Sequence, residues 1–365
     1  YMSAEMLAQF GRTLLFSDRY LTPTTRGMLF DPDHDDEFMV WSAVVQHAAF
    51  GRETGQSAWP YKGGDEPPGY HAALVQLPHG HVGAALINSS ERSSGSLASA
   101  LIKTFYDATR GEPVALDKHG LTPAQYQHYA SEMDEHGHTI DWVDFYNVGN
   151  PVFVNAMFRP AAAGKAYARH GLTGPQYQQE YDQHVKNGPY RLKLIDSYLD
   201  GGEVHYAFLM RRGDDDGAPA YHGANAAEHK RMFDDYTAKG FVPTSVSVVS
   251  HGGERRYSTS WQRREVKDLT VRSTLDAAEY QALVDDLTGK GLELAYLNTY
   301  VHDGQLQYSA VFVGDIDRPQ VLRHDMDAAR YQNEYDTWIG KGYRLKLVTG
   351  AGLGAQHRYA AVWQR

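Results

Sequence analysis

The hydrophobic pattern changes its period in a regular way over the last two thirds of the chain. Apolar side chains first recur at helical spacing, as in Tyr331, Tyr335 and Trp338, and then alternate with polar neighbours, as in Leu345 and Leu347. Turn residues follow, and a second alternating run ends in a large ring that we expect to be a packing anchor. The pattern therefore predicts units made of a short strand, one helix and a β-hairpin.

The units recur with a period of about 51 residues. Successive start positions are 51, 52, 51 and 51 residues apart, and they are His119, His170, His222, Ser273 and His324. A glycine stands eighteen residues after each start, at Gly137, Gly188, Gly240, Gly291 and Gly342. Because glycine tolerates the left-handed conformation that commonly ends a helix, we predict these five residues at helix ends.

Five such units fill residues 111–365, with boundaries at 111–162, 163–213, 214–265, 266–316 and 317–365. One unit cannot bury its own apolar faces, so neighbouring units should share a core. Two arrangements satisfy this requirement, an open stack and a closed ring. We favour the ring, because Arg365 ends the last unit at its final strand and the first unit could pair with it.

Residues 1–110 lack this period and form a separate region. Helical spacing predicts helices over 3–15, from Thr22 and over 97–108, and the stretch 59–90 reads as strands Tyr70–Leu77 and Val82–Asn88 behind a lysine-glycine strand. Together with the repeats, this gives an α+β fold class.

Composition narrows the possible functions. A net charge of −10 argues against binding to nucleic acid through its phosphates, and the absence of cysteine excludes thiolate nucleophiles and cysteine metal sites. No apolar run approaches the roughly 20 residues of a membrane span. We predict no cofactor, no metal, no nucleic-acid partner and no membrane span.

The first region carries the motif Lys62-Gly63-Gly64, followed by the sequence PPGYHAALVQLPHGHVGAALINSS and the closing helix. It resembles the carboxy-terminal third of the serine β-lactamase and penicillin-binding-protein-like hydrolases, whose third motif lies on an edge strand. The repeats resemble the tandem repeats of polyglycine hydrolases and related bacterial proteins. The resemblance implies a β-lactamase-like domain in residues 1–110 and a repeat domain in 111–365.

The same resemblance implies roles for four residues. Lys62 would be a cation beside the nucleophile, Gly63 and Gly64 would let substrate backbone approach, and the amide of Asp65 would help to bind the oxyanion. The nucleophile itself is absent, because no serine stands three residues before any lysine. We expect the segment with S-x-x-K and Y-x-N upstream of Tyr1, and the isolated chain to be inactive. Tyr296-Leu297-Asn298 matches Y-x-N but is interpreted as chance.

Other candidates are interpreted as structural. The acidic stretch Asp31–Glu37 lacks the glycine and glutamate of a calcium loop, and Asp214–Asp216 is a charged connector. The 18 histidines show no metal-binding spacing, and a helix cap or a hydrogen bond between units explains those at the unit starts. Gly350, Gly352 and Gly354 belong to a hairpin turn. The 25 tyrosines could line a groove for peptide or glycan, although their fixed positions favour packing.

Two functions remain. The first is part of a serine hydrolase or peptidase that cleaves a peptide or polymeric amide, with repeats that position substrate or partner. The alternative is a non-catalytic binding module, built from a hydrolase remnant and an aromatic repeat platform. The hydrolase resemblance implies a secreted or extracytoplasmic protein.

Overall fold

A computed structural model describes residues 3–16, 22, 61–66, 70–76, 82–88, 116–135, 137–161, 164–213, 218–314 and 318–365. The chain divides into two compact units, Tyr1–His138 and Thr139–Arg365, and each is described by itself. The helices predicted from Thr22 and over 97–108, the acidic stretch 31–37 and the connector 214–216 lie outside the described residues.

The first unit contains one small antiparallel sheet and a helix that lies against it. Strands β1 (Tyr61–Glu66), β2 (Tyr70–Gln76) and β3 (Val82–Asn88) pair in the order β1-β2-β3. Helix α1 (Ala4–Phe16) lies against β3 and β2. The predicted first helix and both predicted strands are confirmed, and the lysine-glycine segment forms β1.

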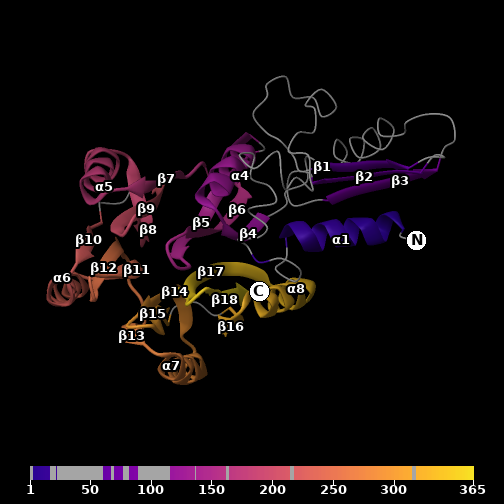
Figure 1. The fold of residues 1–365 in the computed structure, drawn as a ribbon. Helices are drawn as coiled ribbons and strands as arrows, with labels where there is room; N and C mark the ends of the chain where they lie inside the picture. Colours follow the sequence, from indigo (N-terminus) through magenta and orange to yellow (C-terminus); the bar gives the residue numbers. More distant parts are fainter. Residues whose placement is uncertain are drawn as a thin grey trace. The chain divides into compact units, whose positions relative to one another are not determined.

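The repeats follow the predicted element order. Each has a short strand, a helix and two hairpin strands (Figure 1). In chain order the elements are β4 (Leu116–Leu121), α4 (Pro123–Glu135), β5 (His138–Asn147), β6 (Val152–Pro160), β7 (Tyr167–Leu172), α5 (Gly174–Tyr181), the π-helical turn η5 (Asp182–Lys186), β8 (Tyr190–Asp200), β9 (Glu203–Arg212), β10 (Ala220–Ala224), α6 (Ala226–Ala238), β11 (Phe241–His251), β12 (Glu254–Arg263), β13 (Leu269–Leu275), α7 (Ala277–Gly289), β14 (Glu293–His302), β15 (Gln305–Val313), β16 (Gln320–Met326), α8 (Ala328–Gly340), β17 (Arg344–Leu353) and β18 (Gln356–Gln364).

The α+β fold class is wrong, because the described residues are mostly β. Each repeat is a small three-stranded antiparallel sheet with the second hairpin strand in the middle, as in β10-β12-β11. The favoured closed ring is also wrong. The sheets stay separate, and among the described residues no strand pairs with a strand of another repeat. Three strands and one helix of at most 13 residues make strand the dominant structure in every repeat.

Polar side chains at one equivalent position start the repeat helices. The side-chain oxygens of Thr122, Asn225, Asp276 and Asp327 each accept a hydrogen bond from a backbone amide in the first helical turn. These contacts satisfy amides that have no partner within the helix. The helix caps are therefore these residues and not the histidines at the unit starts.

The prediction for the five glycines is confirmed at four of them. Gly137, Gly240, Gly291 and Gly342 have φ angles of 74°, 78°, 81° and 80°. Gly188 differs, because α5 passes into η5 and a Cβ on Gly188 would lie 2.6 Å from the carbonyl oxygen of His184. Pro189 follows directly, and a proline restricts the backbone of the residue before it.

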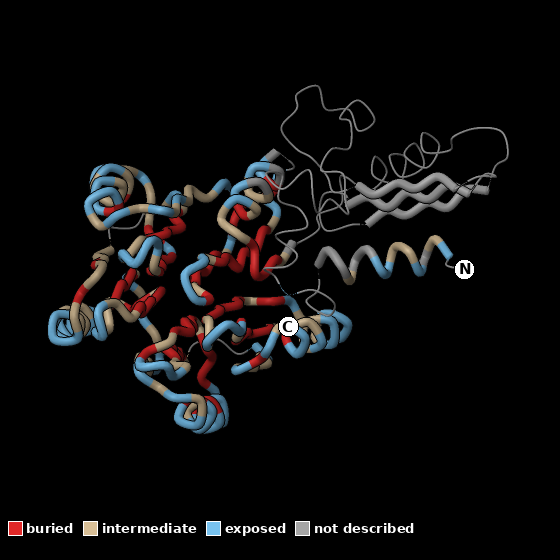
Figure 2. Tube along the Cα trace, viewed as in Figure 1, coloured by how far each residue is buried: buried red, intermediate tan, exposed pale blue. Residues whose placement is uncertain are grey.

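Successive repeats share a core, as their size requires. One cluster joins Tyr280 and Phe312 of the fourth repeat to Leu347 and Val362 of the fifth. The predicted packing anchors Trp261, Phe312 and Trp363 are almost completely buried. In the second unit, helices α5 to α8 lie outside and the buried residues gather on the inner strands (Figure 2).

The histidines at three unit starts pack against rings of the preceding repeat. His170 lies with its ring centroid 5.2 Å from Phe145. His222 lies with its ring centroid 4.8 Å from Tyr177 and 4.9 Å from Tyr206, and His324 lies 5.0 Å from Tyr280. Burial lowers the pKa of all three imidazoles. The predicted hydrogen bond between units is made by His324, to the backbone of Ala277 in the fourth repeat, and ring packing joins each of the three to the repeat before it.

The fifth repeat packs against the hairpin of the first through two glycines. A Cβ on Gly350 would lie 2.7 Å from the ring of Tyr146, and a Cβ on Gly352 would overlap the carbonyl oxygen of Asn147. The same contact buries Tyr146, Phe153 and Tyr359 in one cluster. Only residues without a side chain fit these two positions.

We expect Gly352→Ala to lower the free energy of unfolding by about 1–3 kcal/mol, because the new methyl group overlaps backbone that must move. Urea unfolding followed by tryptophan fluorescence measures this change. Gly340→Ala is the matched control, because a Cβ there meets nothing within 4 Å and helix α8 favours alanine over glycine. Equal stability of Gly352→Ala and the parent would contradict the tight contact.

Candidate functional site

The four predicted site residues all lie in β1, at the edge of the first unit's sheet. Lys62 is opposite Leu74, Gly63 opposite Ala73, Gly64 opposite Ala72 and Asp65 opposite His71. β1 pairs only with β2 among the described strands, so its other edge is open within that set. An edge strand is the position that the hydrolase resemblance implies for this motif.

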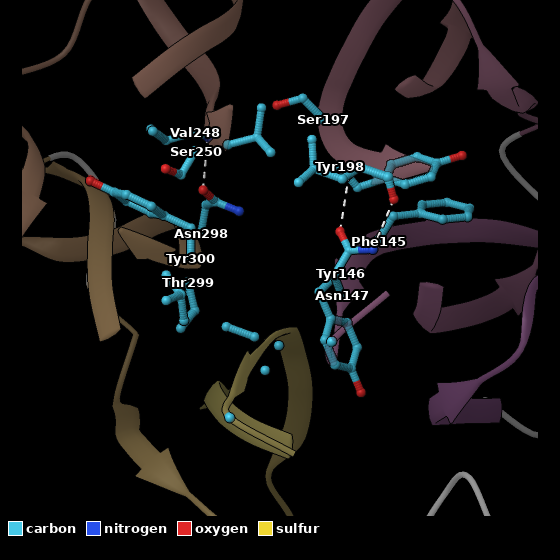
Figure 3. A pocket seen from close by; sticks show the side chains of 18 residues that line it. Phe145, Tyr146, Asn147, Ser197, Tyr198, Val248, Ser250, Asn298, Thr299 and Tyr300 are labelled. Carbon is cyan, nitrogen blue, oxygen red and sulfur yellow. Dashed lines mark hydrogen bonds between the residues drawn. The ribbon is translucent and has the colours of Figure 1, made fainter. Parts of the chain in front are cut away.

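A cavity of about 270 Å³ lies in the second unit, where the first hairpin strands of all five repeats converge (Figure 3). It is built from β5, β8, β11, β14 and β17 and the turns that follow some of them. No charged side chain and no histidine lines it. The lining residues are Phe145, Tyr146, Asn147, Gly149, Ser197, Tyr198, Leu199, Val248, Val249, Ser250, Asn298, Thr299, Tyr300, Val301, Gly350, Ala351, Gly352 and Gly354.

Five hydrogen bonds of one kind hold these strands side by side, and we call them the junction bonds. In each, a backbone amide donates to the side chain at an equivalent position of another repeat. The pairs are Phe145 N to Asp196 Oδ2 (2.6 Å), Ser197 N to Ser247 Oγ (3.0 Å), Val248 N to Asn298 Oδ1 (2.9 Å), Thr299 N to Thr349 Oγ1 (2.9 Å) and Gly350 N to Asp144 Oδ2 (2.9 Å).

Among the five side chains that accept the junction bonds, Asn298 is the one that also lines the cavity. Its side chain is 3% exposed, and Oδ1 is occupied by the amide of Val248. Its Nδ2 donates to no other described residue, and Figure 3 shows this nitrogen pointing into the open space. The amide therefore offers the cavity an unused hydrogen-bond donor.

Two other polar side chains around the cavity make hydrogen bonds to another repeat, whereas the buried Oγ1 of Thr299 has no partner among the described residues. Asn147 spans to the second repeat, accepting from the amide of Leu199 at 3.0 Å and donating to its carbonyl oxygen at 2.8 Å. The Oγ of Ser250 lies 2.9 Å from Nδ1 of His302 in the next repeat. These contacts fix the cavity walls and leave Asn298 as the free amide donor among the described lining residues.

Two junction residues are buried carboxylic acids. Burial, followed by the negative charge of Asp196, raises the pKa of Asp144 well above its ordinary value. Burial raises the pKa of Asp196 to about 6, although Phe145 N and Ser247 Oγ donate to its carboxylate. Neither carboxyl forms an ion pair with a described residue that would offset burial, and the pKa of each is therefore raised.

Within the described ranges, no group of three or more His, Asp or Glu side chains could hold a metal ion. No helix among those residues is long and apolar enough to cross a membrane. The neutral lining of the cavity suits an uncharged ligand, because a charged group would lose its hydration without gaining a counter-charge.

The sequence profile of the polyglycine hydrolase-like structural repeat matches the chain five times, at residues 118–160, 163–213, 219–264, 268–314 and 318–365. The chain belongs to this repeat family. Five repeats with the predicted period are therefore confirmed, whereas no match covers the region assigned to a β-lactamase-like domain. No curated protein matches the chain.

The sequence alone missed the cavity. Its one signal was Asn298, which stands in the Y-x-N match interpreted as chance. Gly350 and Gly352, assigned to a turn, lie in β17 and border the cavity. The tyrosines at fixed repeat positions are buried, as the packing interpretation predicted, and include Tyr177, Tyr280, Tyr308, Tyr331 and Tyr359.

We expect the pKa of Asp196 to make stability depend on pH. Unfolded aspartate titrates near pH 3.9, so between pH of about 4 and 6 the unfolded chain loses this proton before the folded protein does. The contribution of Asp196 to the free energy of unfolding is therefore full below this window and falls as pH rises through it.

Urea unfolding of the parent and Asp196→Asn at several pH values measures this effect together with the coupling of Asp196 to Asp144, which acts in the same direction. The free energy of unfolding of the parent minus that of the variant should decrease from pH 4 to pH 7. A constant difference would show that Asp196 has an ordinary pKa.

Proposed function

We propose that the repeats bind an uncharged, glycine-rich peptide in the central cavity and position it for a serine hydrolase of the β-lactamase-like type. One observation carries the proposal. All five repeats contribute a strand to a single cavity that lacks charge, and concave sites with a few placed polar groups are the usual form of ligand sites. The name of the repeat family supports polyglycine as the peptide class.

In this proposal the first unit supplies part of the catalytic site. Lys62 stabilises negative charge beside a nucleophile, Gly63 and Gly64 admit the substrate backbone, and the amide of Asp65 donates to the oxyanion. The position of these residues in an edge strand supports those roles. The serine with its activating lysine comes from a further part of the catalytic domain, in a secreted protein.

The alternative is a non-catalytic binding module. The sequence favours it in one respect, because no serine stands three residues before a lysine. Both functions include the same cavity as a peptide site, and they differ in whether hydrolysis follows binding.

Filling the cavity should abolish peptide binding. We expect Val301→Trp to weaken binding of a capped glycine peptide at least tenfold, because its indole would occupy the space that Val301 borders. Isothermal titration calorimetry measures the affinity, and thermal unfolding checks that the variant folds. Ile339→Trp, on the exposed face of α8, adds the same ring away from the cavity and should bind like the parent.

A fluorophosphonate probe separates catalysis from binding in this chain. We expect no stoichiometric labelling of the 365-residue polypeptide, because it lacks a lysine-activated serine. Intact-mass spectrometry before and after incubation gives the answer, and a labelled serine located by peptide mapping would contradict this expectation.

A further inference from the structure

The junction positions of the five repeats do the same structural work with different side chains. Asp144, Asp196, Ser247, Asn298 and Thr349 each accept one backbone amide from another repeat. A junction bond needs only an oxygen atom as its acceptor. Asn298 is the residue among them that also carries nitrogen, and its nitrogen takes no part in the junction bond.

The nitrogen of Asn298 is not needed to join the repeats. Threonine and serine make the same junction bond in the fifth and third repeats with oxygen alone. Asn298 is 3% exposed and lines the cavity, and its Nδ2 has no partner among the described residues. The nitrogen is therefore placed where a partner from outside the chain can accept its hydrogen bond.

We propose that Asn298 Nδ2 is the specificity donor of the cavity and binds a main-chain carbonyl oxygen of an uncharged peptide. This inference rests on the proposed function and names the group that recognises the ligand. Nothing in the cavity lining can pair with a charged side chain or terminus. Two of the bordering glycines, Gly149 and Gly354, have no described protein atom closer than 4.0 Å to the position of a Cβ and leave room for a peptide backbone to approach.

The repeats themselves supply the matched variants. Asn298→Thr copies the fifth repeat, keeps an acceptor for Val248 N and removes the nitrogen. Asn298→Asp copies the first two repeats, keeps the acceptor and replaces the donor nitrogen with oxygen. Neither change removes the junction bond, so thermal unfolding should show folded proteins in both cases.

Calorimetric titration of the full chain with acetyl-tetraglycine-amide tests the proposal. We expect both variants to bind at least tenfold more weakly than the parent. In a ¹⁵N spectrum of the parent, the side-chain amide signal that is missing from Asn298→Thr should shift when the peptide is added. A peptide whose amide carbonyls are reduced to methylene groups should not bind the parent.

The outcomes separate this inference from the proposed function. If the parent binds and both variants bind within twofold of it, Asn298 is not the donor, although the cavity remains a peptide site. If the parent does not bind the peptide, both proposals fail. Binding of a chito-oligosaccharide in place of the peptide would also overturn the assignment. The carbonyl oxygen in the cavity would then belong to an N-acetyl group of a sugar and not to a peptide main chain.

Discussion

The arrangement of the repeats depends on satisfying backbone amides where no strand pairing is available. The inner strand of each sheet lies at an edge, and its amides face another repeat instead of a paired strand. A buried amide without a partner is strongly unfavourable, so an acceptor must come from the neighbouring repeat. The junction bonds meet this need with side-chain oxygen, and they hold five separate sheets together without a continuous sheet.

Each junction position must therefore supply one side-chain oxygen that accepts a hydrogen bond, whereas the rest of the side chain can vary. Aspartate, serine, asparagine and threonine all supply the oxygen. What remains of each side chain then differs: the carboxyls of Asp144 and Asp196 have raised pKa values, whereas Asn298 presents a nitrogen to the cavity. The residue at a junction position can therefore change between repeats, and gain a role in binding a ligand, while the hydrogen bond that joins the repeats is kept.

The sequence predicts whatever is local to one repeat. The helices, the glycines that end four of them and the buried rings of the hairpins follow from spacing and side-chain type. It does not predict what depends on a residue 50 positions away. Asp144 and Ser247 alternate with apolar neighbours as solvent-facing residues of a strand do, yet both are buried, because another repeat covers them. The cavity and its donor escaped prediction for the same reason.

The third repeat shows how closely neighbouring repeats are fitted to one another. His229 stands where the other repeats have Tyr126, Tyr177, Tyr280 and Tyr331, and it stacks on Tyr257 with ring centroids 4.2 Å apart. The next repeat starts with Ser273, where its counterparts have histidine to pack on that tyrosine. The change from tyrosine to His229 and the change from histidine to Ser273 therefore occur on the two sides of the contact between the third and fourth repeats. Such paired changes mean that a repeat is adapted to its neighbour, and that exchanging single repeats would disrupt packing even where the junction bonds were kept.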